Sequence, residues 1–321
     1  MRSKCHEYLF SMNALYSTVG VSKQSVHQYL ARQELFLERL SSLRKEVDAI
    51  RREHGGCGLE KMYGMLSPDW IGRDRFIEVF QELGYRVQRK RSGHRTTYPD
   101  RHSTYFNLIE GMLVWDVNQV WQTDITYYWL DGEHYYLTFI IDVYSRRIVG
   151  HAASSSLRVD ANLKALEKAF SLRESVDLRQ LIHHSDRGSQ FTSKRYIEFL
   201  LGRKITRISM CDIAQENAYG ERIHGTIKGE YLRYWNIKSF SSLCKSLDRA
   251  VDNYNTKRSH NHLFRRMPPA KYEEWLSSNT QRRPRVIIYT EGLEKLKGAS
   301  SPNKLYPTKD LRNPICPMVL S

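Results

Sequence analysis

The sequence is poor in the features that mark secreted and membrane proteins. Five cysteines are scattered over 321 residues and no two form a CxxC pair, which argues against a disulfide framework and against a zinc site built on paired thiolates. No apolar run approaches the roughly 20 residues of a membrane helix, and the first residues lack the apolar core of a signal peptide. We therefore expect an intracellular, cytoplasmic protein with free thiols and no membrane contact.

Acidic residues are scarce relative to basic ones. The chain has 50 Lys and Arg against 35 Asp and Glu, a net charge of +15 and a pI near 9.6. The excess is spread evenly, with 18 basic against 13 acidic residues in 1–110, 24 against 19 in 111–275 and 8 against 3 in 276–321. A polyanion that touches several domains explains this distribution, and nucleic acid is the natural candidate; charge that serves solubility alone is the alternative.

The first 30 residues predict a helix-turn-helix. A short helix leads to a turn at Gly20, which permits a tight conformation, and Ser22 is a typical N-cap for a second helix with Val26 and Leu30 facing inward. The outward-facing side chains that we expect on DNA phosphates or base edges are Lys23, Gln24 and His27. An ordinary helical hairpin is the alternative.

Further helices and a basic linker follow. Apolar residues recur at heptad spacing at Phe36, Leu40, Leu43, Val47 and Ile50. We expect this seam to pack on flanking helices, with self-association as the alternative. Residues 59–66 and 73–83 form a second predicted helical pair. Residues 86–101 carry six Lys or Arg and one acidic residue, so we expect this linker to follow DNA through Lys90 and Arg91, unless it is merely solvated.

The central part predicts a mixed sheet. Residues 121–129 are aromatic and β-branched almost throughout, which indicates a buried strand, yet Asp124 lies in its middle. Further strands are expected at 135–142, 146–153, 181–184 and 205–209. Helices are expected at 160–172, which Asp160 caps, at 195–201 and at 214–234. This order is that of an RNase H-like mixed five-stranded sheet flanked by helices. The predicted fold class is therefore an α/β catalytic core behind an all-α N-terminal region.

Three acids in this core form a candidate metal centre. Asp124 is mid-strand, Asp186 ends the fourth strand, which lies beside the first, and Glu221 is on the long helix from Ala214 to Tyr234. At 100° per residue, one face of that helix carries Asn217, Glu221, His224 and Lys228. The opposite face carries the core-facing residues Tyr219, Ile223, Ile227 and Tyr234.

Converging carboxylates repel one another, and hard divalent cations cancel that repulsion. Two Mg²⁺ ions, or Mn²⁺ in their place, about 3.5–4 Å apart can activate a water or a DNA 3′-hydroxyl and stabilise the leaving oxygen. The residues that we expect to contact DNA around this centre are His184, Arg187, Gly188, Asn217, His224 and Lys228. Each acid alone has an ordinary alternative as an ion-pair partner, a turn residue or a surface charge, but the set of three is more specific.

Several motifs resemble one known family. WQTDITY, YLTFIIDVYSRRIVG, HHSDRGSQF, ENAYGERIHGTIKGEY and YNTKRSHNHL are similar to the bacterial insertion-sequence transposases of the IS-three group, in the DDE superfamily with a retroviral-integrase-like core. The resemblance is dense over 114–275 and weaker over 31–90. It implies that Asp124, Asp186 and Glu221 are the metal-binding catalytic triad. Two departures are Glu216, where the family commonly has Asp, and Phe191, where it commonly has Tyr.

The resemblance also implies partners and an organisation. We expect the protein to nick double-stranded DNA at terminal inverted repeats and to join the 3′-hydroxyl to target DNA. It would work as a homo-oligomer on DNA near the bacterial nucleoid, with an upstream-frame helper protein as an option. The expected segments are a helix-turn-helix plus amphipathic helix over 1–55, a second DNA-binding segment over 56–90, a basic linker over 91–113, the catalytic core over 114–276 and a basic tail over 277–321.

Two other functions are compatible with these motifs. One is a catalytically decayed or domesticated DNA-binding regulator, which would bind DNA ends without nicking them. The other is a structure-specific nuclease on the same fold, which would cleave without strand transfer. Two acids outside the triad, Asp142 and Glu230, serve as controls, and their amide variants are expected to retain activity.

Overall fold

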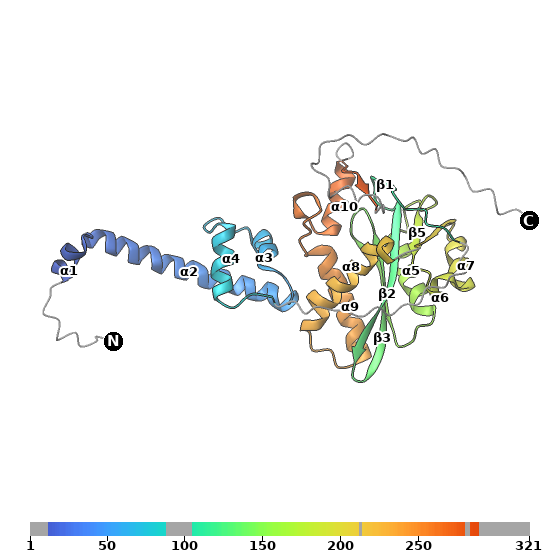
Figure 1. Ribbon diagram of the computed structural model, residues 1–321, viewed down its shortest axis with the longest axis horizontal. Helices are drawn as coiled ribbons and strands as arrows, with labels where there is room; N and C mark the ends of the chain where they lie inside the picture. The colour runs from blue at the N-terminus through green and yellow to red at the C-terminus, as the bar shows by residue number, and fades with distance from the viewer. Residues whose placement is uncertain (1–11, 88–104, 212–213, 280–282, 289–321) are drawn as a thin grey trace, which may run out of the picture.

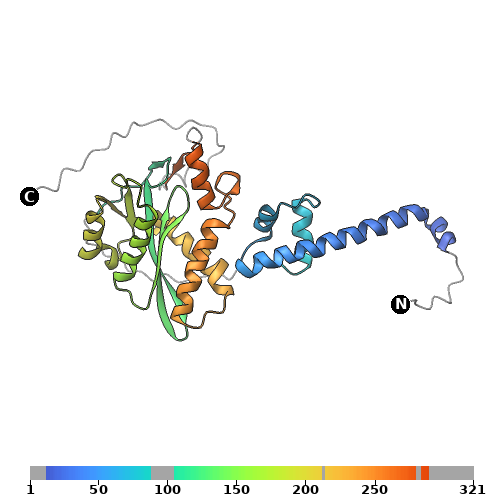
Figure 2. The ribbon, with the colours of Figure 1, turned by 180° about the vertical axis from the view of Figure 1, so that it is seen from behind.

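The computed structural model describes residues 12–87, 105–211, 214–279 and 283–288. Figures 1 and 2 show an N-terminal helical unit that extends from one side of a larger α/β unit. In the described part of the chain, no helix is both long and apolar enough to cross a membrane. Lys90 and Arg91 lie outside the described residues, as does most of the predicted tail.

The larger unit is built on the predicted five-stranded mixed sheet. Its strands are β2 (Val120–Leu130), β3 (Glu133–Asp142), β4 (Ile148–Ser154), β5 (Ile182–Ser185) and β6 (Arg207–Met210). Their order is β4-β3-β2-β5-β6, with β3 antiparallel to both β2 and β4, and with β5 parallel to both β2 and β6. This topology is the RNase H-like one, and it places β2 at the centre.

Helices cover both faces of this sheet, as predicted. On one face α5 (Asp160–Leu172) and α7 (Lys194–Gly202) enclose an apolar cluster that includes Ile140. On the other face α8 (Ala218–Thr226) and α9 (Phe240–Thr256) pack on Phe139 and Ile141. Successive residues of β3 therefore face opposite clusters, as the two-residue period of a strand requires. Asp160 does not cap α5: it is the first helical residue and pairs with Arg195 at 2.5 Å.

The predicted long helix over 214–234 is not one regular helix. It consists of η1 (Ala214–Asn217), α8, the π-helical turn η2 (Ile227–Tyr231) and η3 (Leu232–Tyr234). Ile223 and Ile227 face the core as predicted, but Tyr234 is 43% exposed. A π turn holds more residues than an α turn, so every residue after it is rotated away from the position that a 100° period predicts.

Short elements close the larger unit at one end. β1 (Leu113–Val114) pairs with β7 (Val286–Ile287), and both pack near α10 (Pro269–Ser278) in a third apolar cluster. The remaining short helices are α6 (Ser189–Thr192) and η4 (Phe264–Arg266). The β1–β7 pair returns the described end of the chain to the start of the core.

The N-terminal unit contains α1 (Met12–Val19), α2 (Lys23–Glu53), α3 (Leu59–Leu66) and α4 (Arg73–Glu82). Ser22 caps α2 as predicted, accepting a hydrogen bond from the Ser25 amide at 3.1 Å. The expected inward packing of Leu30 is wrong because α2 continues as one 31-residue helix and leaves Leu30 51% exposed. The heptad seam packs on α3 and α4, so it is the core of this unit, as preferred from the sequence.

The N-terminal unit docks on the larger unit through a glycine pair and a buried charge cluster. The Gly56 amide donates to the Glu230 carbonyl at 2.8 Å. The Glu230 carboxylate contacts His54 at 2.7 Å, Lys61 at 3.0 Å and Arg258 at 2.8 Å. Outside this cluster, Arg249 pairs with Glu53 at 2.5 Å and Arg266 with Glu60 at 3.0 Å. The two units are therefore held together by backbone contact and by charges from both sides.

We expect Gly56→Ala to separate the two units. A Cβ at residue 56 would lie 2.6 Å from Glu230 Cα, which is backbone and cannot move independently. Limited proteolysis should then cut the variant near residue 56 much faster than the parent chain. The control is Gly64→Ala on α3, where a Cβ meets nothing within 4 Å and alanine favours the helix by about 1 kcal/mol. Equal cleavage rates for Gly56→Ala and the parent would contradict this account of docking.

Candidate active site

Asp124 lies at the centre of the sheet and is buried. Its Oδ1 accepts a hydrogen bond from the Ile125 amide at 2.9 Å, and its Oδ2 is 3.5 Å from His224 Nδ1. Burial raises the pKa of Asp124 well above its ordinary value, and the negative charges of Asp186 and Glu221 raise it further. The carboxylate therefore stands in a dry position with two acidic neighbours, as the sequence predicted.

Asp186 reaches the same level of the sheet from the neighbouring strand. In the parallel pair of β2 and β5, Gln122 lies opposite His184. Two residues further along each strand direction come Asp124 and Asp186. The Gly188 amide donates to Asp186 Oδ1 at 3.0 Å, and burial raises the pKa of Asp186. Parallel pairing therefore brings two carboxylates from distant sequence positions side by side.

The third acid stands at the start of α8. Glu221 is exposed in the first turn of this helix, and its charge contributes to the raised pKa of Asp124. Gly220, the preceding residue, lets the helix approach the sheet: a Cβ there would lie 3.0 Å from Asp124 Cβ. The glycine thus sets how closely the helix and the central acid approach each other.

A buried glutamine fixes the start of α8 on the sheet. Gln122 accepts hydrogen bonds from the Tyr219 and Gly220 amides at 3.1 and 3.3 Å, and it donates to the Glu216 carbonyl at 2.9 Å. Asn217 adds a bond from Nδ2 to the Thr123 carbonyl at 3.0 Å. Sequence reasoning missed the role of Gln122. The sequence feature that could have revealed this role is a polar side chain in a largely buried strand, two residues before Asp124.

The chemistry of these side chains fits hard divalent cations. Two acidic neighbours raise the pKa of Asp124, and a cluster of carboxylates of this kind is suited to ions such as Mg²⁺, which take oxygen ligands. Within the described ranges, no group of three or more His, Cys, Asp or Glu is close enough to hold a metal ion. The donor set is therefore of the right kind, with Asp124 and Asp186 in the sheet and Glu221 more exposed on the helix.

Several predicted DNA contacts are buried and belong to the scaffold. His184 is fully buried and its Nδ1 lies 2.8 Å from Ser209 Oγ, so it cannot reach a phosphate. Asn217 and His224 are also buried. The Lys228 ammonium donates to Thr126 Oγ1 at 2.6 Å and to the Tyr127 carbonyl at 3.2 Å. His184 on β5, and Asn217 and His224 on the helical stretch, are thus buried in this structure, whereas Lys228 is half-buried and its predicted DNA contact stays a prediction.

The other residues predicted to contact DNA differ in how exposed they are. Lys23, Gln24 and His27 are exposed on α2. Arg187 is half-buried beside Asp186. Gly188 is buried, and a Cβ there would lie 3.0 Å from Asp186 Oδ1, so this position accommodates the carboxylate. Gly188 stays a predicted DNA contact, and in this structure its close neighbour is the carboxylate of Asp186.

Asp142 and Glu230, the two control acids, both have structural roles. Asp142 is fully buried and accepts hydrogen bonds from the Asn118, Tyr144 and Ser145 amides. Burial raises its pKa to about 6. Glu230 is the centre of the charge cluster at the junction between the units. Both acids hold the fold, so their amides would alter stability.

Two stretches of the chain match known families. Residues 116–215 match the family described as "Integrase core domain", and residues 208–268 match a second family with the same description. The chain is 33% identical over 241 residues to the transposase for insertion sequence element IS629 of Shigella sonnei, and the match covers 72% of this chain and 79% of that protein.

A second relative matches a shorter part. The chain is 31% identical over 172 residues to the putative transposase for insertion sequence element IS986/IS6110 of Mycobacterium tuberculosis, which is 51% of this chain. It spans 61% of that relative's length. Among solved structures, the HTLV-2 integrase catalytic core domain in complex with magnesium aligns with a TM-score of 0.38 and 18% identity, over 52% of this chain and 99% of that one.

Proposed function

This chain belongs to the insertion-sequence transposases that carry an integrase core domain, and on that premise we propose that it is a DNA transposase. It nicks double-stranded DNA at the terminal inverted repeats of its element and joins the 3′-hydroxyl to a target strand. The observation that carries the proposal is the placement of Asp124 and Asp186 at one level of adjacent parallel strands, beside the start of α8 with Glu221. The proposed reaction is an in-line phosphoryl transfer, which needs no covalent enzyme intermediate.

We assign metal binding to Asp124, Asp186 and Glu221, which would hold two Mg²⁺ ions, with Mn²⁺ able to substitute. When bound, the ions activate the attacking oxygen and stabilise the leaving one. The chain contributes orientation: the amides of Ile125 and Gly188 each hold one oxygen of the neighbouring aspartate. Because outer hydrogen bonds of this kind orient ligands before the metal arrives, the two aspartates need little rearrangement.

We assign DNA contacts to exposed basic and polar side chains. Lys23, Gln24 and His27 on α2 would contact the element ends, and Arg187 would contact a phosphate near the acids. Lys90 and Arg91 remain predicted DNA contacts of the linker. The segment roles follow the sequence: DNA binding within 1–55 and 56–90, the basic linker over 91–113, and catalysis within 114–276.

Two element ends must be joined in concert, and one active site handles one strand end at a time. The working complex therefore contains at least two copies of the chain on DNA, with a helper protein from an upstream frame as an additional component. The heptad seam of α2 is not the interface, because it is already occupied by α3 and α4. The complex would act in the bacterial cytoplasm, at the nucleoid.

Metal substitution tests this function. With labelled duplexes that carry the element's terminal repeats, Mg²⁺ or Mn²⁺ should support nicking, and pre-cleaved ends should give joined products. Ca²⁺ is larger and less exacting in geometry, so it should allow DNA binding with little chemistry. A chain that binds ends but never nicks them in Mg²⁺ or Mn²⁺ would be a regulator instead. One that cleaves but never joins pre-cleaved ends would be a nuclease.

A further inference from the structure

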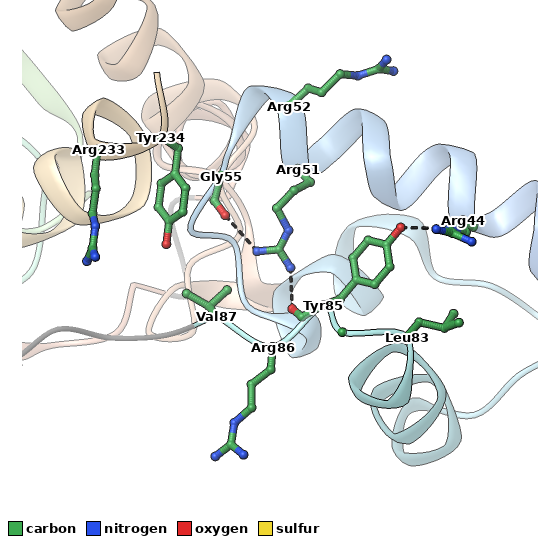
Figure 3. Close-up of a pocket in the computed structure, with 11 residues that line it drawn as sticks. Arg44, Arg51, Arg52, Gly55, Leu83, Tyr85, Arg86, Val87, Arg233 and Tyr234 are labelled. Carbon is green, nitrogen blue, oxygen red and sulfur yellow. Dashed lines mark hydrogen bonds between the residues drawn. The ribbon is translucent and has the colours of Figure 1, made fainter. Parts of the chain in front are cut away.

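A basic cavity lies at the junction of the two units, away from the three acids. It has a volume of about 790 Å³ and is lined by the end of α2, by residues 83–87 and by η3 (Figure 3). Its arginines are Arg44, Arg51, Arg52, Arg86 and Arg233, and none of the eleven lining residues is acidic. Both units contribute, since Arg233 and Tyr234 come from the larger one.

Two of these arginines are used to build the wall. Arg51 donates to the carbonyls of Gly55 and Tyr85, both at 2.8 Å. Arg44 Nε donates to the Tyr85 hydroxyl at 3.2 Å, which in turn donates to Asp48 at 2.5 Å. These bonds fix the aromatic ring of Tyr85 at the centre of the close-up in Figure 3. The wall is therefore an ordered structure and not a loose set of surface side chains.

The other three arginines, Arg52, Arg86 and Arg233, are exposed, and none of them forms an ion pair with a residue in the described parts of the chain. Arg86 and Arg233 extend in the same direction from facing walls in Figure 3. Like charges gathered in this way repel one another, and guanidinium groups are the preferred partners of phosphate oxygens. A ligand that carries several phosphates would complete this cavity.

We propose that this cavity binds the sugar-phosphate backbone of DNA and clamps it across the junction of the two units. The proposal rests on the transposase function and adds a specific binding site to it. Arg86 from the N-terminal unit and Arg233 from the larger unit each take a phosphate, and Arg52 lies at the rim. Such contacts carry no sequence information but fix the register of the DNA on the protein.

The cavity and the acidic site are linked by one stretch of the chain. Glu221 lies in α8 and Arg233 in η3, on either side of the π-helical turn η2. The clamped phosphates should therefore belong to the same bound DNA as the nicked bond, at a different position along it.

The test is a salt titration of DNA binding by the variant Arg86→Gln/Arg233→Gln. Removal of one phosphate-binding side chain reduces the slope of log K against log salt by about 1. The double variant should therefore show a slope reduced by about 2, equally for element ends and unrelated duplexes. Arg52→Gln is a second, single variant, in which the slope should fall by at most about 1. The control is Arg75→Gln, an exposed arginine of α4 outside the cavity. All variants are first compared with the parent by thermal unfolding.

Each outcome has a distinct meaning. A reduced slope in the cavity variants and not in the control supports the clamp. Slopes equal to that of the control overturn it. Inorganic pyrophosphate is the small-anion probe: if it binds the parent and not the variants while DNA slopes are unchanged, the cavity is a small-anion site and the clamp is wrong. If the parent binds DNA but never nicks it, the transposase function fails independently.

Discussion

Asp124→Asn should leave a protein that binds element ends but no longer nicks or joins them. Turnover should fall by a thousandfold or more, which corresponds to a loss of transition-state stabilisation on the order of 4 kcal/mol. The amide keeps the shape of the side chain and removes the charge that would bind the metals. DNA binding should persist or tighten slightly, because a negative charge near the phosphates has gone. Gel-based nicking and joining assays, with binding measured in parallel, provide the comparison.

The stability of this variant is informative as well. Burial and two acidic neighbours raise the pKa of Asp124, so the charged form destabilises the metal-free fold at neutral pH. Asp124→Asn should therefore unfold at the same temperature as the parent or at a higher one. The matched control is Asp131→Asn, at the exposed turn between β2 and β3, where the backbone is left-handed and Asn is tolerated. Joining at the parental rate by repurified Asp124→Asn would overturn the assignment of the site.

Glu230→Gln is expected to destabilise the docking of the two units by about 3 kcal/mol, the usual cost of removing one partner from a buried charge pair. Arg258 and Lys61, both largely buried, would be left without their carboxylate partner. The readouts are thermal unfolding and limited proteolysis near residue 56. Glu53→Gln is the control, because its pairing with Arg249 is half-exposed and worth less than about 1 kcal/mol. Equal effects of the two substitutions would refute a central role for Glu230.

Acidification should weaken the same junction. Burial lowers the pKa of His54, so protonation below about pH 6.5, the ordinary range for histidine, favours the undocked state. Burial alone would raise the pKa of Glu230, but hydrogen bonds from Arg258 and His54 hold it far below its ordinary value. The stabilisation of docking by ionised Glu230 is therefore present above the ordinary pKa of glutamate and is lost as the pH falls below that value. Proteolysis near residue 56 should therefore increase from pH 7 towards pH 4.

The sheet could be predicted because strand pattern and order are local properties of the sequence, and the triad of Asp124, Asp186 and Glu221 stays a prediction. The prediction of His184 failed for a physical reason: β5 is a central parallel strand, covered on both faces, so neither of its adjacent histidines is exposed. Tyr234 was misplaced because no residue pattern announced the π turn before it. Gln122 and Gly220 depend on contacts between β2 and α8, nearly 100 residues apart, which periodicity cannot reveal.

The glycine pair at the junction limits how this protein can be recombined with its relatives. A Cβ at Gly55 would lie 2.3 Å from Tyr234 Cβ, and one at Gly56 would lie 2.6 Å from Glu230 Cα. The contact surfaces of the two units therefore fit so closely that one added Cβ atom would clash. An engineered chimera that exchanges the N-terminal unit of one transposase for that of another cannot simply be joined within the linker. Residues 54–61 and 227–258 have to be taken from the same parent protein. Otherwise the new N-terminal unit will not dock on the larger unit.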